Sequence, residues 1–211
     1  LKFSQLVIST GMKTDYSGVA FQQYCYGCSN LNDIINIKKL IKRIKDSPNI
    51  KSPLVISGAG PTGVELACKI SDLVNAKIEI YLVDKGNKIL PSSKSFNREI
   101  SVSALEERNV RIFLKHFVKS VNEDYIELES LDGEVDSPNE INYSGLIWTV
   151  GLSLNSPDLL TNYLHDNKKI KVNEFLQVKR SKNVFFVGDL TLNDKNPYPS
   201  SAQVATQQGF L

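Results

Sequence analysis

The sequence predicts an α/β protein built around a parallel sheet. Two observations carry this prediction. The apolar segment Leu54–Ser57 is followed by a glycine-rich turn, a helix-forming stretch and a second apolar strand that ends on Asp84, which is the pattern of a βαβ unit. The run Val184–Val187 is apolar without alternation, as expected of a strand that is buried on both faces.

The composition excludes several classes of protein and partner. Hydrophobic residues make up 41% of the 211 residues, which suits a soluble globular core and excludes disordered, collagen-like and transmembrane classes. Twenty-five Lys and Arg residues against 23 Asp and Glu residues leave a net charge of +2. This balance does not favour a polyanion, so we expect no nucleic acid as partner.

The first 50 residues predict a strand, a loop and a helix. The run Leu6–Ser9 is an apolar strand that enters a tight turn at Thr10 and Gly11. Residues 12–30 are expected to form a loop. From Leu31 to Ile44, apolar residues recur at intervals of three and four, which predicts an amphipathic helix with a solvated, lysine-rich face.

Later segments predict further strands and two helices. Asp132-Gly133 is typical of a hairpin turn. A polar loop over residues 193–199 precedes a last helix, for which Ser200 is the expected N-cap and Gln203 the third residue of a capping box. The other predicted elements are helices at residues 64–74 and 96–108 and strands at residues 78–84, 110–114, 125–128, 145–149 and 184–189.

The glycine-rich turn has the context of a dinucleotide-binding site. The segment Gly58-Ala59-Gly60-Pro61-Thr62-Gly63 follows a strand and opens a helix, and Asp84 ends the next strand. In this pattern Gly58 permits the tight turn, Gly60 lets a pyrophosphate approach the backbone, and Gly63 lets helix and strand pack closely. We expect the phosphates at the helix N-terminus and the adenosine ribose on Asp84.

Charges near this turn leave the choice between NADH and NADPH open. The Asp84 carboxylate would repel a 2′-phosphate, which favours NADH. Lys85 and Lys88 follow it directly, and either ammonium group would offset that charge. Glu65 is expected in the first turn of the helix, where its carboxylate would complement the helix dipole.

Three cysteines do not make a disulfide framework, so we expect a reducing, intracellular setting. Cys25 and Cys28 have a CxxC spacing, which is compatible with a redox pair, half of a zinc site or two unrelated thiols. No second CxxC or histidine pair accompanies them in the sequence. We therefore expect no metal site.

Five motifs together resemble the flavoproteins that have two dinucleotide-binding domains. The motif Ala202-Gln203-Val204-Ala205-Thr206-Gln207 is similar to the AQxAxQ motif of type II NADH:quinone oxidoreductases. The resemblance implies a Rossmann-like three-layer NAD(P)H-binding domain inserted in an FAD-binding domain of the same class, which is incomplete here. The other four motifs are Ser9-Thr10-Gly11, residues 58–67, residues 147–151 and Val187-Gly188-Asp189.

The resemblance also implies a division into domains. It gives residues 1–30 as an FAD-domain piece and loop, 31–49 as a connecting helix, 50–150 as the NAD(P)H-binding domain, and 151–211 as the FAD-domain return with the quinone-site motif. The family's upstream FAD fingerprint and downstream amphipathic region are missing from this sequence. We therefore expect a piece of a longer protein, held on the cytoplasmic face of a membrane as a peripheral protein, with a homodimer left open.

Site residues follow from the resemblance as well. Thr10 and Gly11 match a turn that lies against FAD, and Glu65 matches a glutamate near the nicotinamide and the flavin. The further matches are Gly188 and Asp189 to a second flavin contact, and Val150 and Gly151 to a loop beside the nicotinamide.

The last helix has two expected roles. Its N-terminus, at Ala202 and Gln203, matches the helix end that points at the flavin. Gln203 and Gln207 are four residues apart and therefore share a helical face. In the resembling family these two glutamines line the quinone pocket.

The resemblance implies an FAD-dependent oxidoreductase that transfers a hydride from NAD(P)H to flavin and then electrons to a quinone. Glu65, Gln203 and Gln207 are its expected catalytic residues. Two alternatives stay open: a disulfide oxidoreductase similar to thioredoxin reductase that uses Cys25 and Cys28, and a non-catalytic nucleotide-binding redox sensor. Sulfide:quinone reductases need well-separated cysteines near the flavin, which the sequence does not clearly contain.

Overall fold

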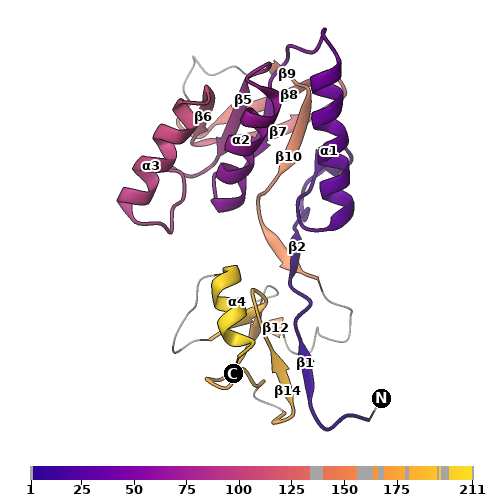
Figure 1. Ribbon diagram of the computed structural model, residues 1–211, viewed down its shortest axis with the longest axis vertical. Coiled ribbons are helices and arrows are strands. Elements are labelled where there is room, and N and C mark those ends of the chain that lie inside the picture. Colours follow the sequence, from indigo (N-terminus) through magenta and orange to yellow (C-terminus); the bar gives the residue numbers. More distant parts are fainter. Residues whose placement is uncertain are drawn as a thin grey trace. The chain divides into compact units, whose positions relative to one another are not determined.

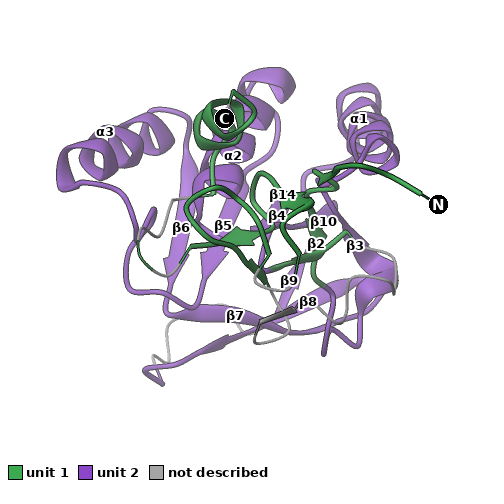
Figure 2. Cartoon of the chain, turned by 90° about the horizontal axis from the view of Figure 1, so that it is seen from below, with its two compact units in different colours: residues 1–15, 152–211 green, residues 16–151 purple. Residues whose placement is uncertain are grey.

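The computed structural model describes residues 2–133, 140–155, 164–165, 169–178, 181–193, 195 and 200–210. The chain divides into two compact units, which Figure 2 shows in different colours. Unit 1 consists of Leu1–Asp15 and Leu152–Leu211, and unit 2 is the continuous stretch Tyr16–Gly151. Unit 2 is thus inserted between the two parts of unit 1.

Unit 2 is built on a five-stranded sheet with the order β3-β10-β4-β5-β6, in which all neighbouring strands are parallel (Figure 1). This sheet confirms the predicted α/β class. The order differs from the sequence order, so the connections cross over the sheet, as a βαβ topology requires. The strands are β3 (Cys25–Tyr26), β4 (Leu54–Ser57), β5 (Ile80–Asp84), β6 (Val110–Leu114) and β10 (Gly145–Trp148).

Helices cover one face of this sheet and an antiparallel meander covers the other, so unit 2 has three layers (Figure 2). Alternate residues of β4 serve different cores: Leu54 and Ile56 pack toward the helices, and Val55 packs toward the meander. The helices are α1 (Leu31–Asp46), α2 (Pro61–Val74) and α3 (Ser95–Glu106), and the meander strands are β7 (His116–Val121), β8 (Tyr125–Ser130) and β9 (Glu140–Asn142).

Unit 1 combines short strands with one short helix. The parallel pair β1 (Leu6–Ile8) and β14 (Val184–Phe186) packs on a small core that includes Ile170 and the fully buried Phe186. The remaining elements are β2 (Met12–Thr14) paired with β11 (Leu152–Leu154), the sheet of β12 (Leu164–His165), β13 (Lys169–Lys171) and β15 (Thr191–Leu192), and helix α4 (Ala202–Gln208).

The expectation that residues 12–30 form a loop was wrong. They contain β2, the 3-10 helix η1 (Gln22–Tyr24) and β3. The strand β3 forms because Cys25 and Tyr26 pair with Leu146 and Ile147 of β10. That partner is far away in the sequence, and a two-residue strand has no periodicity of its own to reveal it.

The predicted cap of the last helix was also wrong. Ser201 is the N-cap of α4, and its Oγ accepts a hydrogen bond from the backbone N–H of Val204 at 3.3 Å. Gln203 is therefore the second helical residue, and the expected capping box with Ser200 does not form. The Ser200 hydroxyl instead accepts a hydrogen bond from Lys169 Nζ at 3.0 Å.

Other local predictions were confirmed within a few residues at each end. Helix α1 begins with a capping box in which Asn30 and Asp33 exchange hydrogen bonds. The strands β8 and β9 are antiparallel, as the Asp132-Gly133 signal predicts, although residues 134–139 of their connection lie outside the described residues. Most of the expected loop at 193–199 also lies outside them.

A lysine caps the other end of α1. The ammonium group of Lys77, in the turn after α2, donates to the carbonyl oxygens of Ile44, Lys45 and Ser47 at 2.7, 2.9 and 2.7 Å. These carbonyls lie in the last turn of α1 and just after it, where cations are favoured. Lys77 thereby joins α1 to α2.

Replacing Lys77 with Met is expected to lower the free energy of unfolding by about 1 kcal/mol, because charge-assisted hydrogen bonds to the α1 carbonyls are lost. Chemical denaturation measures this change. Lys69→Met on the exposed side of α2 is the matched control and is expected to have a smaller effect. Equal effects of the two substitutions would contradict the capping role.

Candidate functional site

The glycine turn joins β4 to α2 at the carboxyl end of the parallel sheet. Gly58 has a φ of +109°, which residues with a side chain rarely adopt. Its N–H donates to the Val83 carbonyl at 2.7 Å, and the Leu90 N–H donates to the Ala59 carbonyl at 2.8 Å. The turn is therefore fixed by neighbouring segments on both sides.

Gly60 and Gly63 meet different surroundings. A Cβ atom on Gly63 would lie 1.8 Å from the Gly58 carbonyl oxygen. Only glycine therefore fits at this position, where α2 packs against the turn. A Cβ on Gly60 would meet no atom within 4 Å. Gly60 is the N-cap of α2, no side chain caps the helix, and Pro61 takes the first helical position. The N-terminus of α2 therefore faces open space, and its unpaired N–H groups suit a phosphate group.

Asp84 is anchored beside this turn. Its carboxylate accepts hydrogen bonds at 2.6 Å from the N–H of Ala59 and at 2.6 Å from the N–H of Gly86. The two bonds use different oxygens, so each oxygen keeps acceptor capacity for a hydroxyl group. Asp84 thus has a structural role in the turn that the sequence analysis did not anticipate.

Thr149 is a residue of the site that sequence reasoning missed. Its hydroxyl lies 2.8 Å from the Ser57 carbonyl oxygen and 3.2 Å from that of Gly58, and its backbone N–H also donates to Ser57. Thr149 therefore holds the start of the turn from the end of β10. The quoted motif at 147–151 contains it, but only the pairing of β10 with β4 reveals its contact.

The other predicted nicotinamide-side residues lie at the ends of the same elements. Val150 and Gly151 follow β10, whose residue Trp148 is in register with Ser57 of β4, so both belong to the edge of the sheet that carries the glycine turn. Glu65 is exposed and is the fifth residue of α2, not a first-turn residue, so the expected dipole role was wrong.

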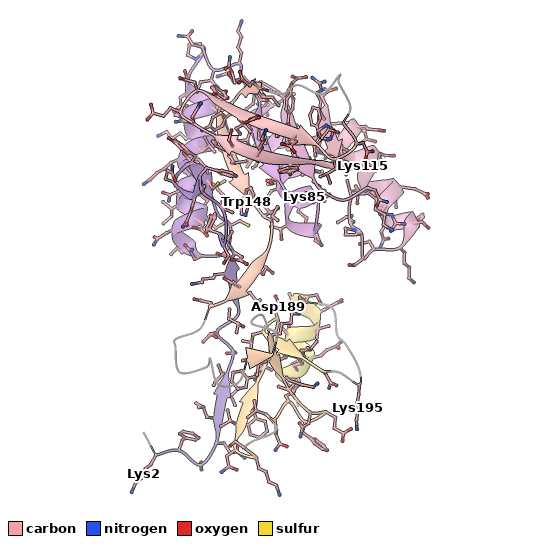
Figure 3. The ribbon with its side chains drawn as sticks, turned by 180° about the vertical axis from the view of Figure 1, so that it is seen from behind. Lys2, Lys85, Lys115, Trp148, Asp189 and Lys195 are labelled. Atoms are coloured by element: carbon pink, nitrogen blue, oxygen red, sulfur yellow. The ribbon has the colours of Figure 1, made fainter. Side chains whose placement is uncertain are left out.

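The lysines after Asp84 differ in their contacts. Lys85 is labelled in Figure 3. Its ammonium group lies 4.4 Å from the ring centroid of Phe117 on β7, which is a cation–π contact. Lys85 is therefore engaged by the meander. Lys88 is exposed and lines a cavity of about 630 Å³ with residues of α3.

The two cysteines of the CxxC pair face different cores. Cys25 packs against the meander-side core, whereas Cys28 packs against the helix-side core. Both are free thiols. Burial raises the pKa of Cys25 to about 12, and burial together with the charge of Asp33 raises the pKa of Cys28. Among the residues that the structure describes, no cluster of His, Cys, Asp and Glu suits a metal ion.

In unit 1 the predicted flavin-side turns come together because their strands are paired. Thr10 and Gly11 follow β1, and Gly188 and Asp189 follow β14, which runs parallel to β1. The Val187 N–H extends this pairing by donating to Ile8 at 3.0 Å. The two glycines have φ values of +69° and +86°, so both turns depend on glycine.

Helix α4 presents two of its glutamines to solvent and buries a third. Gln203 and Gln207 are exposed and share a helical face, as predicted. Gln208 is buried, and its Oε1 accepts a hydrogen bond from the Gly188 N–H at 2.7 Å. Sequence reasoning missed Gln208, although it directly follows the motif. It joins α4 to the turn that contains Asp189.

Comparison with known families identifies this arrangement. The sequence matches the pyridine nucleotide-disulphide oxidoreductase family over residues 1–209. The chain belongs to this family. Its members are flavoproteins that bind FAD and NAD(P)H, and type II NADH:quinone oxidoreductases are among the relatives. This confirms the resemblance and the fold class inferred from the five motifs.

Curated relatives are distant and longer. The chain is 28% identical over 193 residues to demethylphylloquinone reductase of Synechocystis sp., covering 90% of this chain and 46% of the relative. It is 23% identical over 234 residues to a type II NADH:quinone oxidoreductase of Staphylococcus saprophyticus, covering 98% and 56%. The chain thus spans about half the length of the curated relatives it matches.

Solved structures show the same fold. The NDH2 enzyme of Plasmodium falciparum, in complex with NADH, matches with a TM-score of 0.77 at 23% identity, covering 92% of this chain and 45% of that one. A reduced CoADR-RHD of Bacillus anthracis matches with a TM-score of 0.76 at 21% identity, covering 98% and 36%.

In the described part of the chain, none of the helices has the length and apolar character that crossing a membrane requires. The names of some relatives place them in organelles, such as the mitochondrial external alternative NADH-ubiquinone oxidoreductase of Yarrowia lipolytica.

Alanine substitutions at the two helix-start glycines are expected to separate folding from binding. Gly63→Ala should lower the free energy of unfolding by at least about 2 kcal/mol, because its Cβ would overlap the Gly58 carbonyl. Gly60→Ala should change it by less than about 1 kcal/mol, since nothing surrounds that Cβ, yet weaken NADH binding at least about tenfold by filling the space in front of the helix. Denaturation and fluorescence titration measure the two effects. Intact NADH binding in a folded Gly60→Ala protein would contradict the site.

The thiols of Cys25 and Cys28 are expected to react slowly with iodoacetamide in the folded protein. With a pKa of about 12, the Cys25 thiol is almost entirely protonated at pH 7.5. Because this pKa lies far above 7.5, the labelling rate should continue to rise at pH values where a free cysteine is already fully ionised. The urea-unfolded chain is the control and should react as free cysteine does. Rapid labelling of the native protein at pH 7.5 would instead favour a redox pair.

Proposed function

We propose that the chain acts in an NAD(P)H:quinone oxidoreductase. Unit 2 binds the nicotinamide dinucleotide, and unit 1 contributes part of the FAD site. The observation that carries the proposal is the glycine turn, in which open space faces the uncapped N-terminus of α2 and Asp84 is anchored alongside. Family membership supports both cofactors.

We assign NADH as the preferred dinucleotide. The anchored Asp84 carboxylate accepts from a ribose hydroxyl and repels a 2′-phosphate. The ammonium group of Lys85 lies on the Phe117 ring and Lys88 lines the cavity beside α3, so neither lysine forms an ion pair with Asp84. Gly58, Gly60, Pro61, Thr62 and Gly63 form the cradle for the pyrophosphate, in which the N–H groups of Gly60, Thr62 and Gly63 and the helix dipole are the attracting elements.

The bound cofactors supply the hydride chemistry of the reaction, and the residues of the chain supply position and charge. On the nicotinamide side, Glu65, Val150 and Gly151 surround the dinucleotide at the carboxyl edge of the sheet. On the flavin side, Thr10, Gly11, Gly188 and Asp189 bind from the paired ends of β1 and β14, and Ala202 and Gln203 present the start of α4.

A quinone is the proposed electron acceptor. The exposed face shared by Gln203 and Gln207 supplies two amide groups for the quinone carbonyl oxygens. Similarity to the quinone oxidoreductase of Staphylococcus saprophyticus and to demethylphylloquinone reductase supports this choice. Since quinones of this kind are lipids, the whole protein would work at a membrane surface as a peripheral protein.

The disulfide reductase alternative is less well supported. Cys25 and Cys28 pack against opposite faces of the sheet, and burial raises the pKa of both thiols. These features oppose a low-pKa thiolate that exchanges with a disulfide. A nucleotide-binding redox sensor remains the second candidate, since the glycine turn serves it equally. Flavin reduction by NADH, followed by quinone turnover, distinguishes the enzyme from the sensor.

The Asp84→Ala substitution tests the dinucleotide assignment. We expect the affinity for NADH to fall about tenfold through loss of the charge-assisted ribose bonds, and the affinity for NADPH to fall much less. Loosening of the turn, which Asp84 also anchors, would weaken both nucleotides equally. The ratio of the two dissociation constants is therefore the readout, and an unchanged ratio would argue against the ribose contact.

Substitution of Gln207 by Leu tests the quinone assignment in the whole, flavin-loaded protein, because unit 1 contributes only part of the FAD site. We expect NADH-driven bleaching of the flavin to keep its rate, because Gln207 lies outside the dinucleotide site. Reoxidation by quinone should slow about tenfold, as expected for the loss of one hydrogen bond to a substrate. Stopped-flow absorbance measures the two half-reactions separately. An equal decrease in the rates of flavin reduction and flavin reoxidation would contradict the assignment.

A further inference from the structure

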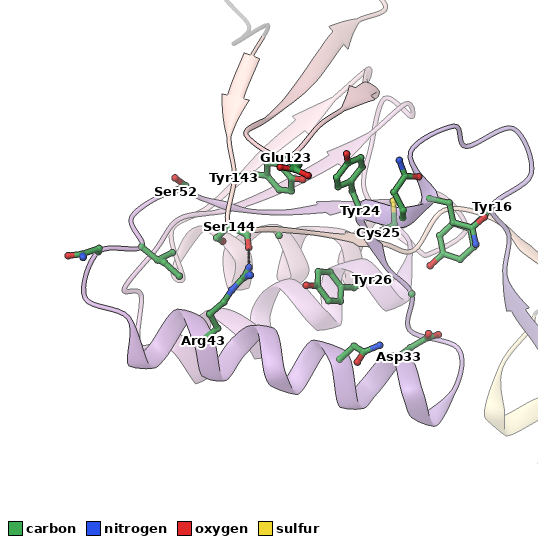
Figure 4. A pocket seen from close by; sticks show the side chains of 17 residues that line it. Tyr16, Tyr24, Cys25, Tyr26, Asp33, Arg43, Ser52, Glu123, Tyr143 and Ser144 are labelled. Carbon is green, nitrogen blue, oxygen red and sulfur yellow. Dashed lines mark hydrogen bonds between the residues drawn. The ribbon is translucent and has the colours of Figure 1, made fainter.

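A second cavity lies in unit 2 along helix α1, with a volume of about 810 Å³ (Figure 4). This volume is within the range of small-molecule sites. None of its lining residues belongs to the glycine turn, and Asp84 is not among them. The cavity extends from Asp33 near the start of α1 to Asn49 beyond its end, so we refer to it as the α1 groove.

The α1 groove exists because the parallel sheet ends at β3. Among the described residues, β3 pairs only with β10, and no strand covers its other edge. Tyr26 packs toward the helices on one side of this edge, and Cys25 and Tyr143 pack toward the meander on the other. The groove therefore runs along the open edge of β3, with residues of both the helix layer and the meander layer in its lining.

Aromatic rings gather along this groove. Tyr24, Tyr26 and Tyr143 all line it (Figure 4). Burial raises the pKa of Tyr143, and the nearby Tyr24, Cys25 and Tyr26 raise it further, which is consistent with their close approach. The Tyr143 hydroxyl donates to the Asn122 carbonyl at 2.7 Å, so its ring is held in place. Rings on both sides favour the flat face of another aromatic ring.

Arg43 is the one positively charged residue among those that line the groove, which also include the carboxylates of Asp33 and Glu123. Its guanidinium donates to the Ser144 carbonyl at 2.5 Å, which holds it over the groove, as the dashed line in Figure 4 marks. It forms no ion pair with any residue that the structure describes. Asp33, at the other end, is occupied in part by hydrogen bonds from Ser29 and Asn30. A guanidinium has five N–H donors, so donors remain for a carboxylate.

We propose that the α1 groove binds a planar aromatic molecule that carries a carboxylate. The ring lies between Tyr26 on the helix side and Tyr24 and Tyr143 on the meander side. The carboxylate accepts hydrogen bonds from Arg43. This site is independent of the proposed dinucleotide and quinone sites, since it shares no residue with either.

The probe for this proposal is 4-hydroxybenzoate, titrated against the full chain and followed by NMR of the tyrosine ring signals. We expect saturable shifts of the Tyr24, Tyr26 and Tyr143 signals with a dissociation constant of about 1 mM, typical of such a small ligand. The uncharged analogue 4-hydroxybenzamide should bind about tenfold more weakly, because it makes no charge-assisted bond to the guanidinium. Excess NADH should leave the titration unchanged.

Two charge variants on α1 complete the test. Arg43→Gln should weaken 4-hydroxybenzoate about tenfold and leave 4-hydroxybenzamide nearly unaffected. Lys42→Gln removes the same charge from the neighbouring, exposed position and should leave both affinities unchanged. Absence of saturable shifts in the wild-type protein, equal affinity for acid and amide, or equal effects of the two variants would overturn the proposal. If Arg43→Gln fails to fold, the affinities of the wild-type protein for 4-hydroxybenzoate and 4-hydroxybenzamide still test the proposal.

Discussion

The close approach of α2 to the end of β4 is the constraint on which unit 2 depends. At Gly63 there is no room for a side chain, because a Cβ would lie 1.8 Å from the Gly58 carbonyl oxygen. The contact draws the helix N-terminus onto the sheet edge, and of the three glycines in the turn only Gly60 faces open space. Asp84 and Thr149 bond to the same turn from the two flanking strands. Binding geometry and packing are therefore set by one contact.

In unit 1, too, strand pairing and hydrogen bonds hold glycine turns in place. Parallel pairing of β1 and β14 brings two glycine turns to one end of the pair, and the buried Gln208 holds the second turn against α4. The buried Gln208 amide is satisfied because its Oε1 accepts the hydrogen bond from the Gly188 N–H. The strand pairing and the Gln208 bond thus connect both turns to helix α4, which carries the exposed Gln203 and Gln207.

The βαβ unit and α1 could be predicted because their signals are local: apolar runs, glycines at fixed offsets and a helical period. The strand β3, Thr149 and Gln208 could not, because each acts through a partner far away in the sequence, namely β10, the glycine turn and Gly188. The roles carried over from the resembling family stay predictions. Capping failed for a different reason, since Ser200 and Ser201 are chemically equivalent and only backbone geometry chooses between them.

The most direct test of the account is an NMR titration of the chain with NADH, read at the backbone amides. If the pyrophosphate lies on the uncapped start of α2, the amide signals of Gly60, Thr62 and Gly63 should shift most, followed by that of Ala59 through its bond to Asp84. Shifts that avoid these amides and cluster elsewhere would contradict a dinucleotide site at the glycine turn.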